Sequence, residues 1–158
     1  MLEDRSKLED EILHDRSVLI VDNDNRLVSL IKDILETQGF SVSVASCGEA
    51  AIAKLKDEKY PCAILDYSLS DIKGDELAND FRLEVPNMGI ILLTGFKSSI
   101  DPKRLRVFNY VFEKPANLEA LIAAVQQIIR TSRRENERVH AIQSNNHIYS
   151  KLSHTRLD

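Results

Sequence analysis

The chain has 158 residues and a formal net charge of -4, with 43% hydrophobic and 29% charged residues. These values are typical of a soluble globular protein, and the length allows one domain with a full core plus short tails. The acidic balance argues against the uniformly basic surface of a nucleic-acid binder. Apolar stretches such as Met88 to Leu93 are far too short to span a bilayer, and the acidic first residues do not resemble a secretory signal, so we expect a cytoplasmic protein.

Short apolar runs alternate along the chain with segments of helical period. The predicted strands are residues 17–22, 40–45, 62–66, 88–93 and 108–113. The predicted helices follow them in turn, at about 25–38, 46–57, 74–85, 102–107 and 117–130. Continuous apolar runs are typical of parallel strands buried on both faces, and each crossover between such strands needs its own helix. The sequence therefore predicts an α/β fold, a doubly wound five-stranded parallel sheet with helices on both faces.

The ends of several helices carry capping signals. Gly39 follows the first helical segment as a C-terminal cap, and Ser46 with Glu49 three residues later forms a capping-box pattern for the second. Asp101 and Pro102 are suited to start the fourth helix, but only about two turns fit before the fifth strand. We therefore expect a shortened fourth helix.

Three parts of the chain differ in character: residues 1–16 form an acidic N-terminal extension, 17–130 the folded domain, and 131–158 a polar C-terminal extension. The first has weak apolar spacing at Leu8 and Ile12, and either extension could continue a helix or fray. Arginines around the start of the C-terminal extension predict a solvated helix face, with a nucleic-acid contact as a minor alternative. They are Arg130, Arg133, Arg134 and Arg138. Cys47 and Cys62 lack metal-like spacing, so we expect reduced thiols.

Polar side chains stand at the carboxyl ends of four predicted strands. They are Asp22-Asn23-Asp24, Asp66, Thr94-Gly95 and Lys114-Pro115. In an open parallel sheet, sites form just beyond these strand ends. Two acids, an amide, a hydroxyl and an ammonium on one edge suit a divalent metal and a phosphoryl group.

From Ser17 to about Arg130 the chain resembles the receiver domain of two-component response regulators of the chemotaxis-regulator type. The motifs that carry the resemblance stand in order along the chain: Asp22 after strand one, Asp66 closing strand three, Gly74 eight residues later, Thr94 with Gly95, and Lys114-Pro115. Each motif alone is a weak signal, but five at the ends of the right strands argue against chance. The resemblance implies a flavodoxin-like receiver fold and a phosphoprotein that relays signals.

The phosphoryl site can be assigned residue by residue. Asp66 is the expected phosphoacceptor, because a strand-end carboxylate can attack phosphorus to form an acyl phosphate; the alternative is an acid that caps a loop. Lys114 would neutralise phosphoryl oxygens, and the resemblance implies a cis peptide bond before Pro115. Thr94 would donate its hydroxyl to the phosphoryl group, although alone such a threonine more often binds backbone.

The same resemblance implies Mg²⁺ as cofactor. Asp22 and Asp66 would hold the cation with their carboxylates, since hard cations prefer oxygen ligands. The backbone carbonyl of Ser68 completes the set in the family. Asn23 stands where family members usually carry a second acid, so it should be a weak ligand, and Asp24 could compensate only if its loop turns inward.

Two further departures concern output. The aromatic residue expected three positions before Lys114 is replaced by Val111, and Tyr110 should face the other side of its strand. The segment from Thr94 to Lys114 is also a few residues shorter than usual in the family. We therefore expect phosphorylation to be retained and conventional signalling through the fourth helix and fifth strand to be altered.

Two alternatives remain open. Asp22 and Asp24 after an apolar strand also resemble the haloacid dehalogenase phosphohydrolases, in which they would be nucleophile and general acid. Those enzymes need a later acidic pair at a strand end, and the acids after Lys114 do not stand there: Glu119, Glu135, Glu137 and Asp158. The other alternative is a degenerate receiver that serves as a phosphate-independent interaction module, which Asn23 and Val111 motivate.

The expected function is that of a single-domain receiver. It would accept a phosphoryl group on Asp66 from a histidine kinase or histidine phosphotransfer protein and lose it by hydrolysis. It would catalyse its own phosphotransfer and dephosphorylation, and so would not be an enzyme acting on a separate substrate. No output domain fits after Ile129, so we expect signalling to an unknown downstream protein by direct contact, with a homodimer as an option.

Overall fold

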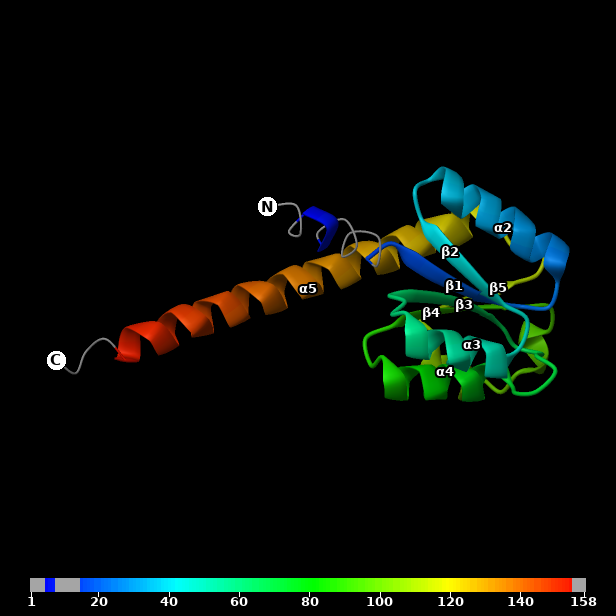
Figure 1. Ribbon diagram of the computed structural model, residues 1–158. Coiled ribbons are helices and arrows are strands. Elements are labelled where there is room, and N and C mark those ends of the chain that lie inside the picture. The colour runs from blue at the N-terminus through cyan, green and yellow to red at the C-terminus, as the bar shows by residue number, and fades with distance from the viewer. Residues whose placement is uncertain (1–4, 8–14, 155–158) are drawn as a thin grey trace.

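The computed structural model describes residues 5–7 and 15–154 of the chain. Its centre is a five-stranded parallel sheet in the order β2-β1-β3-β4-β5 (Figure 1). The strands are β1 (Ser17–Val21), β2 (Ser41–Ala45), β3 (Cys62–Asp66), β4 (Gly89–Thr94) and β5 (Tyr110–Glu113). This arrangement confirms the doubly wound fold predicted from the alternation of apolar runs and helical segments.

Helices cover both faces of the sheet (Figure 1). Helices α2 (Asn25–Thr37) and α5 (Leu118–His154) pack on one face, and α3 (Gly48–Asp57) and α4 (Gly74–Glu84) pack on the other. The side chains of the central strands divide between two cores, because successive residues of a strand point to opposite faces. Val18 and Ile20 join the core under α2 and α5, whereas Leu19 and Val21 join the core under α3 and α4.

The C-terminal end of α2 follows the sequence prediction, whereas its N-cap was not predicted. Asp24 is the N-cap, and its carboxylate accepts a hydrogen bond from the backbone N–H of Leu27 at 3.2 Å. Gly39 follows the helix with a φ of 85°, a left-handed conformation that glycine adopts without steric cost. Its N–H donates to the carbonyl of Glu36, so the chain reverses into β2.

The predicted capping box of α3 is wrong. The N-cap is Cys47 rather than Ser46, and it makes no side-chain cap hydrogen bond. Asp71, from the loop before α4, accepts hydrogen bonds from the N–H groups of Gly48 at 2.9 Å and Glu49 at 2.8 Å. These backbone donors hold the pKa of the Asp71 carboxyl below its ordinary value. The carboxylate of Asp71 therefore caps α3 in place of the Ser46 hydroxyl. It accepts hydrogen bonds from two N–H groups, and the positive end of the helix dipole stabilises its negative charge.

The helix predicted at residues 102–107, between β4 and β5, is shorter than expected. Between β4 and β5 the chain forms two short 3₁₀ helices, Lys97–Ser99 (η1) and Arg104–Val107 (η2), in place of a two-turn α-helix. Ile100 and Phe108 anchor this segment in the core beside α4. A 3₁₀ helix rises about 2.0 Å per residue, against 1.5 Å for an α-helix, so a short connection in this form covers more length than the same residues would in an α-helix.

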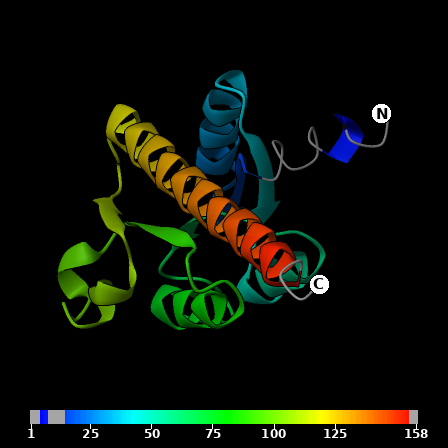
Figure 2. The ribbon, with the colours of Figure 1, turned by 90° about the vertical axis from the view of Figure 1, so that its left-hand side faces the viewer.

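Helix α5 runs without interruption through the predicted domain boundary at residue 130. It comprises 37 residues, and its C-terminal part projects from the domain as a single rod (Figures 1 and 2). Near its exit, the side-chain amide of Asn136 donates to the carboxylate of Asp15 at 3.2 Å. The apolar spacing at Leu8 and Ile12 lies outside the described residues. No helix in the described part of the chain is long and apolar enough to cross a membrane.

Two glycines provide a matched test of the packing behind the site. A Cβ atom at Gly74 would lie 2.7 Å from the carbonyl oxygen of Asp66, whereas a Cβ at Gly95 would have no atom within 4 Å. We expect Gly74→Ala to lower the free energy of unfolding by about 1–3 kcal/mol, because the backbone after Asp66 must shift. Gly95→Ala should change it by less than about 0.5 kcal/mol. Chemical denaturation of both variants measures the difference, and equal effects would contradict this account.

Candidate functional site

Three strand ends bring two acids and one ammonium together. Asp22 directly follows β1, Asp66 ends β3, and Lys114 follows β5. The Nζ atom of Lys114 lies 2.8 Å from Oδ2 of Asp22 and 3.5 Å from Oδ1 of Asp66. The side chains of the two acids are only 5% and 11% exposed and that of the lysine 23%, so the group is largely withdrawn from water. The structure thus brings together three of the predicted site residues.

The charges in this group shift the pKa values of Asp66 and Lys114. Burial raises the pKa of the Asp66 carboxyl above its ordinary value, the charge of Asp22 raises it further, and Lys114 opposes both. Burial alone would lower the pKa of Lys114, but the hydrogen bond and charge of Asp22, together with Asp66, raise it overall. Lys114 is therefore a fixed cation, while Asp66 is a carboxylate whose ionisation is disfavoured.

Thr94 closes the same edge at the end of β4. It is fully buried, and its hydroxyl oxygen accepts a long hydrogen bond of 3.3 Å from the N–H of Phe96. Its carbonyl accepts a hydrogen bond from the N–H of Lys114 at 2.8 Å, which fixes the lysine backbone beside β4. The Lys114–Pro115 peptide bond is cis, as the resemblance implied.

The oxygen donors beside this group fit a divalent cation with two acids rather than three. Asp22 and Asp66 converge on one ammonium, which shows that a positive charge is accommodated between them. Asn23 and the residue Ser68 are exposed at the surface of the same edge. Asp24 does not compensate for Asn23, because its carboxylate caps α2, while its own N–H donates to Asp22 at 2.9 Å. Among the described residues, no cluster of three acidic, histidine or cysteine side chains could hold a metal.

A second polar group, next to Asp66, was not predicted from the sequence. Arg104 on η2 donates a hydrogen bond to the hydroxyl of Tyr67 at 3.0 Å, and its Nε atom lies 3.6 Å from Oδ2 of Asp75. The other carboxylate oxygen of Asp75 is buried without a hydrogen-bond partner in the described structure. No short spacing in the sequence links these residues, because each comes from a different loop or helix.

The side-chain alternation of β5 agrees with the prediction for the aromatic position. Val111 packs against the core beside α4, whereas Phe112 packs against the core beside α5. Tyr110 is 37% exposed and pairs with Ile91, which belongs to the α5 side. No aromatic ring of β5 therefore stands on the side of the sheet that η2 covers.

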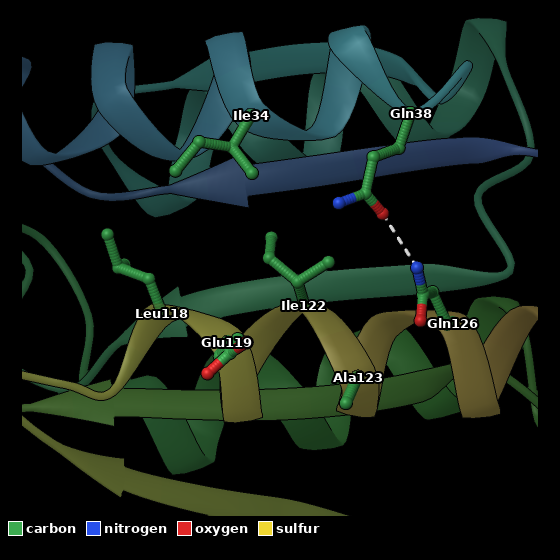
Figure 3. Close-up of a pocket in the computed structure, with 7 residues that line it drawn as sticks. All are labelled: Ile34, Gln38, Leu118, Glu119, Ile122, Ala123 and Gln126. Atoms are coloured by element: carbon green, nitrogen blue, oxygen red, sulfur yellow. Dashed lines mark hydrogen bonds between the residues drawn. The ribbon is translucent and has the colours of Figure 1, made fainter.

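A groove of about 440 Å³ lies between α2 and α5, away from the charged group. Ile34, Leu118 and Ile122 form its apolar lining, and the side-chain amide of Gln126 donates to that of Gln38 across one end at 2.6 Å (Figure 3). Glu119 is the only ionisable residue among those that line this groove. The groove offers no set of groups for phosphoryl chemistry, so we assign the candidate site to the strand ends.

Comparison with known proteins agrees with this geometry. Residues 18–126 match the family model of the response regulator receiver domain. The chain belongs to the response regulator receiver family. It is 33% identical over 118 residues to the transcriptional regulatory protein CpxR of Klebsiella pneumoniae, an alignment that covers 73% of this chain and 50% of the relative. The chain thus spans about half the length of the curated relatives it matches.

Solved structures show the same fold. A CheY-like receiver domain protein from Methanospirillum hungatei aligns with a TM-score of 0.69 at 26% identity and covers 76% of this chain and 98% of its own. The response regulator TrrA from Thermotoga maritima, solved in complex with Mg²⁺ and BeF, aligns with a TM-score of 0.66 at 26% identity over 72% and 98% of the two chains. This receiver domain therefore belongs to the proteins of two-component signalling.

Family membership and local geometry both oppose the phosphohydrolase alternative. That alternative needs Asp24 as a general acid, but the Asp24 side chain is the cap of α2, which begins at the next residue. It also needs a later acidic pair, and Glu119 lies instead beside the α2–α5 groove.

The raised pKa of Asp66 predicts a pH-dependent stability. A carboxyl whose folded-state pKa is raised destabilises the fold when ionised, so this cost is absent below the unfolded pKa and grows as pH rises toward the folded one. We expect Asp66→Asn, in metal-free buffer at pH 7, to increase the free energy of unfolding by on the order of 1 kcal/mol. Lys114 retains its shorter contact with Asp22 in this variant.

The gain should shrink as pH falls below the ordinary carboxyl range, which denaturation at several pH values would measure. Asp24→Asn is the matched control, because it removes a nearby charge while asparagine remains a good N-cap. A gain in stability that did not depend on pH would contradict the electrostatic explanation.

Proposed function

We propose that this receiver accepts a phosphoryl group on Asp66 and catalyses its own phosphotransfer and dephosphorylation, without acting as an enzyme on a separate substrate. The observation that supports this most directly is the position of Lys114 Nζ, within 3.5 Å of carboxylate oxygens of both Asp22 and Asp66. A nucleophile, a second acid and a fixed cation then share one edge of the sheet.

In the proposed reaction, an oxygen of the Asp66 carboxylate attacks the phosphorus of a phosphohistidine on the donor. The P–O bond forms as the P–N bond breaks, and the donor imidazole leaves with the electron pair and takes up a proton. Lys114 faces the added negative charge, while Thr94 turns its hydroxyl from Phe96 N–H to a phosphoryl oxygen. Attack by water on phosphorus later restores the carboxylate and releases inorganic phosphate. Little covalent chemistry is required of the protein beyond this positioning and charge neutralisation.

We also propose Mg²⁺ as the cofactor of this reaction. Asp22 and Asp66 would hold it with their carboxylates, Ser68 with its backbone carbonyl, and Asn23 weakly with its amide oxygen. When bound, the cation would neutralise charge on the phosphoryl oxygens. The absence of a third acid in this donor set predicts weaker binding than a full acidic site would give.

The proposed donor is a histidine kinase or a histidine phosphotransfer protein in the cytoplasm. The proposed output is contact with a further protein. We propose a solvated face rather than a nucleic-acid contact for the exposed arginines of α5, because polar and acidic residues lie between them in the sequence. They are Arg130, Arg133, Arg134 and Arg138.

Phosphorylation can be tested by mass. Intact-mass spectrometry after incubation with acetyl phosphate and Mg²⁺ should show one added phosphoryl group, and Asp66→Asn should show none. Asp24→Asn, which changes a neighbouring acid outside the reacting group, should retain it. Label that persisted in Asp66→Asn would contradict the assignment of the nucleophile.

An aspartate at position 23, where this chain has asparagine, should increase the affinity for Mg²⁺. Asn23→Asp adds a negative charge beside the metal site, and because this position is exposed the added attraction should be about 1 kcal/mol, or about fivefold in affinity. Titration calorimetry should therefore show tighter Mg²⁺ binding, whereas Asp24→Asn should leave it nearly unchanged. Equal affinity of Asn23→Asp and the natural chain would contradict the proposed ligand set.

One observation favours a second candidate, a phosphate-independent interaction module. Asn23 is exposed and Asp24 is engaged as a cap, so only two acids face the cation position. The mass experiment separates the two candidates, because an interaction module would take up no phosphoryl group even at high acetyl phosphate concentration.

A further inference from the structure

The C-terminal part of α5 carries exposed apolar side chains on a helix that has left the domain (Figures 1 and 2). They are Val139, Ile142, Ile148, Tyr149 and Leu152. Within the folded domain, the buried residues of the same helix contribute to the core beside α2. The apolar pattern therefore continues beyond the surface that it covers inside the domain.

Three of these five residues, Val139, Ile142 and Tyr149, continue a seven-residue period that begins in the core, whereas Ile148 and Leu152 do not. One series runs through Leu121, Ile128, Glu135, Ile142 and Tyr149, and a second, offset by three residues, runs through Leu118, Val125, Ser132, Val139 and Asn146. We call the part of these two series beyond Ile128 the seam. Its apolar members are Val139, Ile142 and Tyr149. Ile148 lies outside both series, on another side of the helix.

A seven-residue repeat corresponds to 3.5 residues per turn, whereas a straight α-helix has about 3.6 residues per turn. The stripe drifts by about 20° per heptad, so by Ile142 the direction that faces the sheet at Leu121 has turned by about 60°. The seam thus moves off the surface of its own domain. A partner that supercoils around the helix would follow this drift, which is the geometry of a left-handed coiled coil.

We propose that the seam is a homodimer interface, in which two copies of this chain form a parallel, in-register two-stranded coiled coil along residues 131–152. A two-fold axis parallel to the helix would place each seam residue opposite its own copy. Val139, Ile142 and Tyr149 would then form apolar layers, and Asn146 would pair with itself. A single asparagine in such a core is known to favour a two-stranded register.

The residues that flank the seam fit a second copy. These positions are occupied by Thr131, Asn136, Arg138, Gln143, Asn145, Ser150 and Leu152. In a parallel pair, Arg138 of one helix faces Gln143 of the other, so no like charges meet across the flanks. Arg138 is the one charged residue among these flanking positions, which gives little basis for a partner recognised by charge.

Glu135 is the one unfavourable member of the seam. In the dimer its carboxylate would face the same carboxylate of the second copy, and like charges in apposition weaken association. With three apolar layers, one serine layer, one asparagine layer and one repulsive layer, we expect a weak, reversible dimer. The proposal can therefore be tested with one variant that should strengthen the dimer and another that should weaken it.

The test is sedimentation velocity of the full 158-residue chain over a range of concentrations, with matched variants. Ile142→Asn should weaken dimerisation by at least about tenfold, because it removes an apolar layer. Ile148→Asn makes the same chemical change at a residue of similar exposure, 54% against 60%, and should leave the dimer intact. Glu135→Leu should tighten the dimer by at least about tenfold. A monomer at every concentration, or equal effects at positions 142 and 148, would overturn the proposal.

The parallel register has its own test. Ser132→Cys, in a Cys47→Ser background, should form an intermolecular disulfide under mild oxidation, because the two copies of position 132 lie opposite one another. In an antiparallel pair these positions would be separated by most of the helix, roughly 30 Å at 1.5 Å per residue. A dimer that did not cross-link would overturn the proposed arrangement. Neither experiment requires phosphorylation, so its outcome is separate from that of the proposed function.

Discussion

The site depends on one electrostatic constraint, which is that two nearly buried carboxylates share a single edge of the sheet. Like charges that are withdrawn from water repel each other strongly, so a cation close to both stabilises the arrangement. Lys114 supplies it from β5, although β4 lies between its strand and that of Asp66. Thr94 and Gly95 end β4 with small side chains, and no atom lies within 4 Å of the position of a Cβ at Gly95. The lysine can therefore reach past the end of β4 to both acids.

Much of this arrangement could be predicted because it depends on local patterns. The apolar runs before Asp22, Asp66 and Thr94 define buried parallel strands, and in such a sheet the carboxyl ends meet on one edge. The cap of α3 could not be predicted in the same way. Ser46 and Glu49 form a plausible local capping box, but the position is taken by Asp71, which lies more than twenty residues away and becomes a neighbour only once the sheet has formed.

The connection between β4 and β5 shows a second limit of sequence reasoning. Asp101 and Pro102 predicted an α-helix that starts at Pro102, but the structure has a 3₁₀ helix that starts at Arg104, with Lys103 as its N-cap. Ile100 and Phe108, which are buried on either side of it, are the tertiary contacts that a local capping pattern does not reveal. The hydrogen bond between Arg104 and Tyr67 could not be predicted either, because it joins η2 to the residue that follows Asp66, far away in the sequence. In this receiver, where Val111 stands three positions before Lys114, that contact is a direct physical link between the end of β3 and the shortened segment.

The length of α5 gives the domain mechanical leverage. The part of the helix beyond residue 130 extends about 36 Å at 1.5 Å per residue, while its first three turns are held in the core beside α2. A rigid rod anchored at one end converts a small rotation at its base into a large displacement at its tip. A tilt of about 5° at the domain surface would move the far end by roughly 3 Å, a distance comparable to one hydrogen bond. A Cβ atom at Gly89 would clash with the side chain of Ile128, so a change of one methyl group at this contact between sheet and helix would displace the opposite end of α5.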